Sequence, residues 1–392
     1  MLDDLLPYYE NELTYLRRLS KEFAAKYPKI ASRLQMDGEV CEDPHVERMI
    51  ESFAFLTSRI HKKLDDEFPQ ITEAMLSVLY PHFLRPVPSM SIAQLELAPG
   101  AEITTAQELP RHSMLLTRPV QGLPVRYRTG YPVEVWPIRI ADARLEAAER
   151  SAFAVTQDDT VATVRLRIEA TGQLPLSKLP IRRLRLYLDG ESPLVHALHE
   201  LLLNAATGIT LRAPDDLPQV PPVRLPAHAL KPVGFEDEDA LLDYDPRSFL
   251  GYRLLQEYFV LPEKFLFVDI EGLDTGRFER GMEIAIELGS VGRPERLQRL
   301  EQAVSADSFR LFCTPIVNLF KQQGEPIRVS QERHEYQVVP DVRRPLGLEV
   351  YSVDWVRKSS RGPAGSEVVE FHPAYSVRHG LHDDGGGHYW YL

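Results

Sequence analysis

Apolar residues in the first eighty positions recur at steps of three and four, which places them on one face of an α-helix. The first run predicts a helix over residues 5–27, which Pro28 is expected to end. Its apolar face consists of Leu5, Tyr9, Leu13, Leu16, Leu19, Phe23 and Tyr27. Asp43-Pro44 predicts the start of a second helix, because aspartate caps free N–H groups and proline suits the first turn.

The second helix has an apolar stripe that is expected to face inward. The stripe consists of Val46, Met49, Ile50, Phe53, Ile60 and Leu64. A third, short helix is predicted after Phe68-Pro69, and the prolines at 81, 86 and 88 mark the end of the helical region.

From Ser91 onward the apolar period changes from about 3.6 to 2, which is typical of antiparallel strands with one face on a core and one in water. Strands are predicted over residues 93–97, 164–168, 184–188, 264–270, 282–288 and 309–313, and strand-like sequence begins again at 348–353. Helices are predicted over residues 192–203, closing near Gly208, and 248–258. The pattern predicts an α+β fold: an N-terminal helical region followed by β-rich mixed domains, with antiparallel sheets and a few helices.

Four regions are expected along the chain. They are an N-terminal helical region (1–87), a β-rich domain with one helix (88–232), a second α+β domain (233–345) and the start of a further β-rich region (346–392). The proline-rich stretch 213–232 predicts a stiff linker or long loop between the second and third regions. The last region looks interrupted, because Tyr389-Trp390-Tyr391-Leu392 is typical of the start of a buried strand.

Composition narrows the classes of function. The 392 residues are 44% hydrophobic and carry a formal net charge of −12, which disfavours nucleic acid as the main partner. The two cysteines, Cys41 and Cys313, lie far apart, so they exclude a disulfide scaffold and favour a reduced, intracellular protein. No basic, apolar leader opens the chain, and no apolar run approaches the ~18 residues of a membrane span, so no direct membrane insertion is expected.

Motifs that carry catalytic chemistry are mostly missing, and no catalytic, cofactor-binding or metal-ligating residue is predicted. His196-Ala197-Leu198-His199-Glu200 has the wrong order for a zinc protease and is interpreted as part of an amphipathic helix. The acidic runs 65–67 and 236–239 are interpreted as solvated faces or partner contacts. Metal-dependent hydrolysis by the C-terminal residues remains the alternative hypothesis; these are His372, His379, His382, Asp383, Asp384 and His388.

Several long blocks of sequence resemble a known family. They include Asp43-Pro44-His45-Val46-Glu47-Arg48, Lys63-Leu64-Asp65-Asp66-Glu67-Phe68-Pro69, Leu254-Leu255-Gln256-Glu257-Tyr258-Phe259 and the run from Phe309 to Phe320. In this order they resemble the TssF family, also called VasA or ImpG, the baseplate subunits of the bacterial type VI secretion system. The resemblance covers nearly the whole chain, although TssF-like chains continue past residue 392.

The resemblance implies a non-enzymatic structural subunit, similar in role and fold to the wedge proteins of contractile phage baseplates. Such a subunit assembles with TssG, TssE and TssK around the VgrG spike hub in the cytoplasm, and the baseplate docks on the inner-membrane complex. It implies no catalytic residue and no cofactor.

One apolar helix face is predicted to be a partner interface. It consists of Tyr9, Leu13, Leu16, Leu19 and Phe23, and its outer part is expected to dock on a partner subunit or a second copy. The alternative is that it packs only on later parts of the same chain. The segment from Phe309 to Phe320 is instead predicted to be core, with Pro315 ending its strand.

Overall fold

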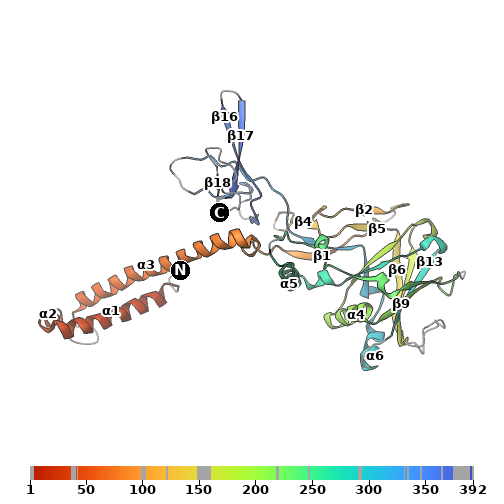
Figure 1. Cartoon of the computed structure of the whole chain (residues 1–392), viewed down its shortest axis with the longest axis horizontal. Coiled ribbons are helices and arrows are strands. Elements are labelled where there is room, and N and C mark those ends of the chain that lie inside the picture. Colours follow the sequence, from red (N-terminus) through yellow and green to blue (C-terminus); the bar gives the residue numbers. More distant parts are fainter. Residues whose placement is uncertain are drawn as a thin grey trace. The chain divides into compact units, whose positions relative to one another are not determined.

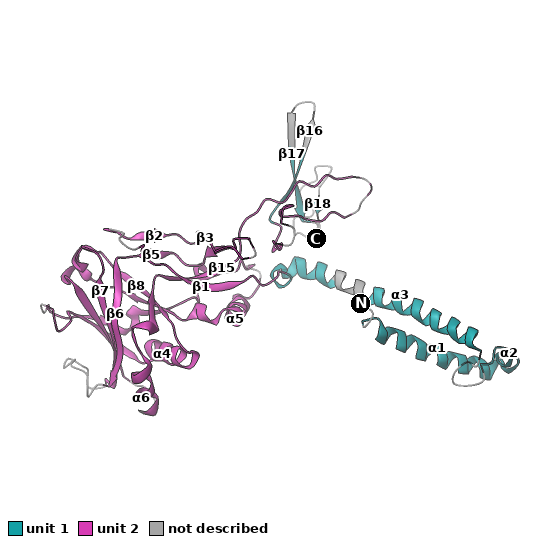
Figure 2. Cartoon of the chain, turned by 180° about the vertical axis from the view of Figure 1, so that it is seen from behind, with its two compact units in different colours: residues 1–84, 354–392 teal, residues 85–353 magenta. Residues whose placement is uncertain are grey.

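The computed structural model describes residues 4–36, 41, 43–98, 103–120, 122–147, 160–217, 220–245, 248–289, 294–330, 332, 335–344, 347–362, 365–373 and 389–390 (Figure 1). The chain divides into two compact units. Unit 1 comprises Met1–Leu84 and Asp354–Leu392, and unit 2 comprises Arg85–Val353 (Figure 2). The architecture is the predicted α+β class.

Unit 1 begins with the predicted helices. Helix α1 (Leu6–Lys26) ends two residues before Pro28, and that proline opens a short helix, α2 (Pro28–Arg33). Helix α3 (Pro44–Leu79) starts where predicted, with the Asp43 carboxylate accepting the His45 N–H at 2.8 Å. The predicted break before a third helix is wrong. Pro69 lies inside the continuous helix α3, because one missing N–H removes a single bond while the helical run continues on both sides.

Helices α1 and α3 lie side by side and form the helical hairpin of unit 1 (Figure 1). Ion pairs join Arg17 to Glu47 (2.6 Å) and Lys62 to Asp4 (3.8 Å), so the two helices run in opposite directions. The side of α3 that meets α1 carries small side chains: Ala54 and Ser58 are fully buried. Their spacing of four residues gives α3 a flat strip against which α1 can approach closely.

The C-terminal part of unit 1 is a β-hairpin with one added strand. Strands β16 (Val356–Gly362) and β17 (Gly365–Pro373) are antiparallel, and β18 (Tyr389–Trp390) pairs with β17 in parallel. The strand start predicted at 348–353 is wrong, because those residues have no regular structure and the strand begins at Val356. The predicted strand at the chain's end exists, but Tyr389 is exposed rather than buried.

Unit 2 is built on two antiparallel sheets that face each other, here called the sandwich. The first sheet consists, in order, of β10 (Val223–Pro226), β9 (Ala206–Arg212), β13 (Gly281–Leu288), β7 (Ala162–Ala170) and β6 (Ile138–Ala147). The second consists of β11 (Leu230–Val233), β12 (Phe267–Glu271), β8 (Arg183–Leu188) and β14 (Phe309–Leu311). Gly208 does not close the preceding helix as predicted; it lies within β9.

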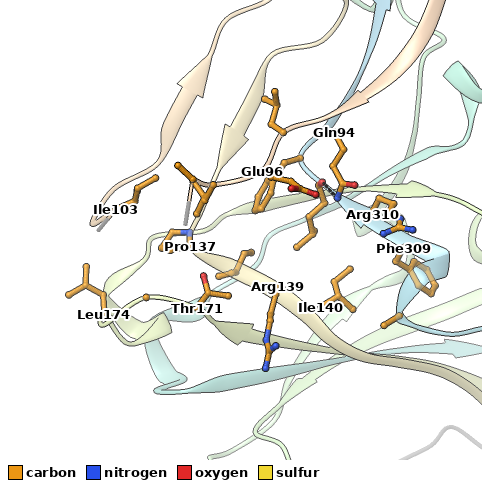
Figure 3. Close-up of a pocket in the computed structure, with 18 of the residues that line it drawn as sticks. Gln94, Glu96, Ile103, Pro137, Arg139, Ile140, Thr171, Leu174, Phe309 and Arg310 are labelled. Atoms are coloured by element: carbon orange, nitrogen blue, oxygen red, sulfur yellow. Dashed lines mark hydrogen bonds between the residues drawn. The ribbon is translucent and has the colours of Figure 1, made fainter. Parts of the chain in front are cut away.

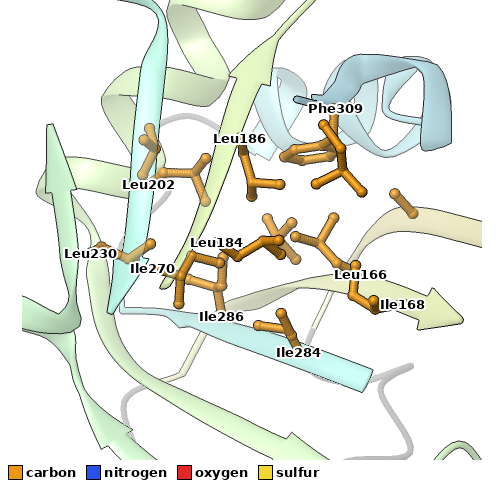
Figure 4. Close-up of a cluster of buried hydrophobic side chains, with 14 of the residues drawn as sticks. Leu166, Ile168, Leu184, Leu186, Leu202, Leu230, Ile270, Ile284, Ile286 and Phe309 are labelled. Carbon is orange, nitrogen blue, oxygen red and sulfur yellow. The ribbon is translucent and has the colours of Figure 1, made fainter. Parts of the chain in front are cut away.

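The sandwich encloses the main core. Figure 4 shows side chains from both sheets and from one covering helix meeting in a single cluster. Its labelled members are Leu166, Ile168, Leu184, Leu186, Leu202, Leu230, Ile270, Ile284, Ile286 and Phe309. The alternating apolar residues predicted at 164–168, 184–188 and 282–288 therefore do face a core.

The opposite face of the first sheet differs from the prediction. Arg165 of β7 was expected in water, but only 7% of it is exposed. Its guanidinium pairs with the Glu283 carboxylate of the neighbouring strand at 2.5 Å and with Glu146 at 3.2 Å. Arg212 also pairs with Glu283, at 3.0 Å. Oppositely charged side chains on adjacent strands therefore shield one another from solvent and supply the hydrogen bonds that water would otherwise make.

Smaller elements complete unit 2. A third sheet runs β1 (Met90–Gln94), β15 (Cys313–Val317), β4 (Arg126–Thr129) and β3 (Met114–Leu116), and a two-stranded sheet joins β2 (Gln107–Leu109) to β5 (Val133–Val135). The helices are α4 (Ser192–Asn204), α5 (Leu250–Val260) and α6 (Pro294–Ala303). Helices α4 and α5 match the helices predicted over 192–203 and 248–258 to within two residues.

A single residue joins two of these sheets. Phe312 has φ +58°, a left-handed conformation, and it separates β14 in the sandwich from β15 in the third sheet. The prediction that Pro315 ends the strand is wrong: Pro315 lies within β15, where its carbonyl accepts the Gly130 N–H at 2.7 Å. The buried Phe309, Leu311 and Cys313 match the predicted core face, whereas Phe312 is only half-buried.

Strands cross the expected boundary at residue 232. In the first sheet, β13 pairs with both β7 and β9, and in the second sheet β12 pairs with β8 and β11. The stretch 213–232, predicted as a linker or loop, contains β10 and most of β11. Prolines are compatible with these positions because β10 and β11 are edge strands.

Candidate assembly interface

The predicted interface on α1 divides into two parts. Tyr9, Leu13 and Leu16 are half-buried on the side of α1 that carries the contacts with α3. Leu19 and Phe23 are 40% and 37% exposed, and the Phe23 ring lies 5.3 Å from that of Tyr27. No described residue of α1 is fully buried.

Helix α3 carries a longer apolar row that is also exposed. Met49, Phe53, Leu56, Ile60 and Leu64 follow one another at steps of four, three, four and four residues, and each is more than half exposed. At about 1.5 Å per residue the row is roughly 22 Å long. The sequence pattern predicted that most of these residues face inward; that prediction is wrong, and Ala54 and Ser58 occupy the seam instead.

The two exposed rows lie on the same side of the helical hairpin. Helical geometry places Tyr15, Leu19 and Phe23 about a quarter-turn from the face of α1 that meets α3. The row on α3 is rotated away from the α1–α3 contact in the same sense, when each helix is viewed from its own N-terminus. Because the two helices are antiparallel, equal senses of rotation bring both rows to the same side of the hairpin. We call this surface the hairpin face; it consists of Tyr15, Leu19, Phe23, Met49, Phe53, Leu56, Ile60 and Leu64.

The hairpin face exposes large apolar side chains to water. Each large apolar side chain left in water forgoes roughly 1.5–3 kcal/mol of burial. Contiguous apolar areas of this kind mark binding sites on soluble proteins. Phe55 is 42% exposed and lies on the opposite side of α3. It is rotated by about 100° from Ala54 in one sense, whereas the exposed row is rotated from Ala54 in the opposite sense.

Catalytic chemistry finds no support in the described part of the chain. Among those residues, no group of three or more His, Cys, Asp and Glu side chains is placed to hold a metal ion. His372 is exposed, and the remaining tail candidates His379, His382, Asp383, Asp384 and His388 lie outside the described residues. None of the helices formed by the described residues has an apolar stretch long enough to span a bilayer.

The histidines of α4 behave as the amphipathic reading predicts. His196 is exposed and His199 is half-buried, and burial is the main reason that the pKa of His199 is lowered. Val195, Leu198, Leu201 and Leu202 form the buried side. Cys313 is likewise a core residue, and burial raises the pKa of its thiol to about 12, so it is a poor nucleophile.

A groove of about 880 Å³ opens in unit 2 where three strand edges converge (Figure 3). It is lined by residues at the end of β1, the start of β6 and along β14, including Gln94, Ile140 and Phe309. Its arginines are engaged: Arg139 pairs with Glu169 at 2.9 Å, and Arg310 with Asp189 at 3.1 Å. Both arginines of the groove are therefore paired with a carboxylate.

The likeness to one solved structure indicates the class of protein. The chain resembles a chain of the type VI secretion system TssK-TssF-TssG baseplate subcomplex, with a TM-score of 0.63 and 28% sequence identity. That likeness covers 83% of this chain and 58% of the other. A second solved structure, the baseplate complex from the type VI secretion system, is 25% identical with a TM-score of 0.47, over 93% of this chain and 67% of the other.

The family follows from the sequence. The family model "Type VI secretion system, TssF" matches residues 1–392, and the chain belongs to this family. It is 39% identical to the type VI secretion system component TssF1 of Pseudomonas aeruginosa over 381 residues. That match takes in 95% of this chain but only 60% of the relative, so the chain spans about three-fifths of the relative's length.

Proposed function

We propose that this chain is a non-enzymatic structural subunit of a type VI secretion baseplate wedge. Membership of the TssF family supports this role, and so does the likeness to a chain of a TssK-TssF-TssG baseplate subcomplex. The exposed hairpin face is the observation that carries the proposal, because a structural subunit needs apolar surface that partners cover.

The proposed partners are TssG and TssK, with TssE and the VgrG spike hub in the larger assembly. The role in the assembly is to support growth of the tail tube and sheath for effector delivery. The assembled baseplate works in the cytoplasm, docked at the inner-membrane complex. The hairpin face is proposed to pack against helices of TssG or of a second copy of this chain, with Leu19 and Phe23 at the end of the face next to the Arg17–Glu47 ion pair.

Two phenylalanines of α3 provide a matched test. Phe53 belongs to the hairpin face and is 62% exposed, whereas Phe55 lies on the other side of the same helix. We expect Phe53→Asp, tested in the complete baseplate gene set, to abolish copurification with TssG, because a buried unpaired carboxylate is costly at an interface. Phe55→Asp should leave copurification intact.

Folding is checked separately by circular dichroism of each purified variant. Loss of copurification with a retained helical spectrum supports the proposal. Equal effects of the two substitutions contradict the assignment of the hairpin face. Retention of TssG by both variants contradicts a contact between the hairpin face and TssG, and unchanged self-association of Phe53→Asp as well contradicts its use in assembly.

A further inference from the structure

Helix α5 of unit 2 turns its charged residues inward and its aromatic residues outward. Arg253 and Glu257 are its buried residues, 2% and 0% exposed. Tyr252, Leu255 and Phe259 are 52%, 55% and 82% exposed, and their spacing places them on one face. An ordinary surface helix has the opposite polarity.

A buried ion pair fixes this orientation. The Glu257 carboxylate accepts the N–H groups of Leu241 and Leu242 at 2.8 and 3.2 Å and pairs with the Lys264 ammonium. Lys264 also donates to the Gly234 carbonyl at 2.9 Å, and both charged side chains are fully buried. Rotating α5 to hide its aromatic face would strip these charges of their partners, so the outward aromatic face is built into the fold.

The acidic segment noted in the sequence is attached to the same helix. The Arg253 guanidinium donates to the carbonyls of Phe235 and Glu236 at 3.5 and 3.3 Å. It also pairs with the Asp237 carboxylate at 3.4 Å. The exposed acids Glu236, Asp237 and Glu238 are thereby held against α5.

Aromatic rings connect the helix to this segment without interruption. The ring of Tyr258 lies 5.9 Å from that of Phe259 and 6.0 Å from that of Phe265, which lies 5.0 Å from Phe235. Phe235 directly precedes the acids. We call this surface the α5 patch; its exposed members are Phe235, Phe249, Tyr252, Leu255, Tyr258 and Phe259.

The size of the α5 patch suits one docked helix. The exposed parts of its five aromatic side chains alone amount to roughly 600 Å², taking about 200 Å² for a whole aromatic side chain. That equals the largest apolar patch of an ordinary monomer and approaches the roughly 800 Å² that one partner contributes to a standard interface. No member of the patch is charged, and the charges held at its edge, Glu236, Asp237 and Glu238, are all negative.

We propose that the α5 patch binds an amphipathic helix of a partner protein, whose apolar face is flanked by lysine or arginine. The apolar face packs along Tyr252, Leu255 and Phe259. The basic side chains meet the acidic segment at the edge, which sets the orientation and speeds the encounter.

Two synthetic helical peptides of about 18 residues provide the probes, long enough for five turns. Both carry leucine on one face; the first is flanked by lysine and the second by glutamate. We expect the full chain to bind the lysine peptide at least about tenfold more tightly, and Leu255→Ser with Phe259→Ser to remove that binding. Val329→Ser, at an apolar position of unit 2 that is 77% exposed and outside the patch, is the control and should bind like the parent chain.

The charge contribution is tested by Glu236→Gln with Glu238→Gln. These changes should weaken lysine-peptide binding several-fold at low salt and have little effect near 1 M salt, where the Debye length is about 3 Å. Equal binding of the two peptides, or binding that survives Leu255→Ser with Phe259→Ser in a chain with an unchanged unfolding midpoint, overturns the proposal. Binding to anionic phosphatidylglycerol vesicles in preference to either peptide also overturns it.

Discussion

In unit 2, strands and the covering helix α4 direct their apolar residues into one sandwich core, and Phe267, Leu186 and Ile284 are fully buried there. In the helical hairpin, the largest apolar residues point to solvent, and small residues such as Ala54 fill the seam. Both regions have amphipathic sequence. The difference shows that amphipathic spacing identifies an apolar face that other residues will cover. It does not show whether those residues belong to the same chain or to a partner.

The largest expected effect separates two phenylalanines, one in each region. Phe267→Ala should lower the free energy of unfolding by about 3–5 kcal/mol, because the ring is fully buried against those of Tyr131 and Tyr187. Phe53→Ala should cost less than about 0.5 kcal/mol, because the side chain is already 62% exposed. Urea unfolding of the free chain measures both; comparable losses would break the comparison.

Ion pairs give a second contrast. Glu257→Ala should destabilise unit 2 by about 3 kcal/mol, because it leaves the Lys264 ammonium buried without its partner. Glu22→Ala in α1 removes the exposed pair with Arg18 and should change the free energy of unfolding by less than about 0.5 kcal/mol. The double variant Glu257→Gln with Lys264→Met removes both charges but keeps an acceptor for the Leu241 and Leu242 N–H groups, so it should recover much of the loss. If it is no more stable than Glu257→Ala, desolvated charge is not the cause.

Each region contains one cysteine, which allows a chemical comparison. Ellman's reagent near neutral pH should label the partly exposed Cys41 readily and Cys313 only as unit 2 unfolds, because Cys313 is buried. Mass spectrometry of the labelled peptides distinguishes the two thiols. Rapid labelling of Cys313 in the native protein would show that the core around β15 opens easily.

Alkaline pH should weaken unit 2 through the same thiol. The pKa of Cys313 is about 12 in the fold against 9.0 for an ordinary thiol, so the unfolded chain loses this proton first. The stability due to Cys313 is therefore complete below pH 9 and declines as pH rises toward 12. The pKa of Tyr187 is raised to about 12, so its contribution to stability also decreases as the pH rises from 10 toward 12. Cys313→Ala should show a shallower loss in denaturant titrations above pH 9; an unchanged slope would contradict this.

The smallest expected effect concerns the hairpin face. In the double variant Leu19→Ser with Met49→Ser, the Met49 change should alter the free energy of unfolding by less than about 0.5 kcal/mol and the Leu19 change by less than about 1 kcal/mol, because Met49 is 68% and Leu19 40% exposed. The parent chain should self-associate at high concentration through this face, and the variant should do so less. Sedimentation velocity measures the change. A parent chain that stays monomeric at high concentration would show that the hairpin face does not drive self-association.

Local signals in the sequence were strong enough to predict much of the fold. The Asp43 cap, the two-residue period of β7, β8 and β13, and the core position of Cys313 depend on neighbours along the chain, which the sequence displays. The strands of unit 2 also pair across long separations, as β13 does with β7, and no local pattern specifies that pairing. Pro69 and Pro315 were misread because a proline breaks an element only where its missing N–H or its ring conflicts with neighbours.

The candidate surfaces were harder to predict for a related reason. The apolar row on α3 outweighed the small residues Ala54 and Ser58 in the hydrophobic pattern, although that pair, four residues apart, was the available signal for a close helix seam. The sequence did not indicate that α5 turns charged residues inward and aromatic residues outward. Arg253 and Glu257 are buried by partners at Glu236 and Lys264, whose proximity only the folded chain creates.

The junction at Phe312 has a mechanical consequence. With one residue between β14 and β15, the ends of the two strands can separate by only about 7 Å before a paired residue must leave its sheet. The third sheet and the sandwich therefore have no slack between them. Strand β15 is hydrogen-bonded to β1 on one side and to β4 on the other. A force on β15 is therefore transmitted directly to β14, and we expect the two sheets to move together.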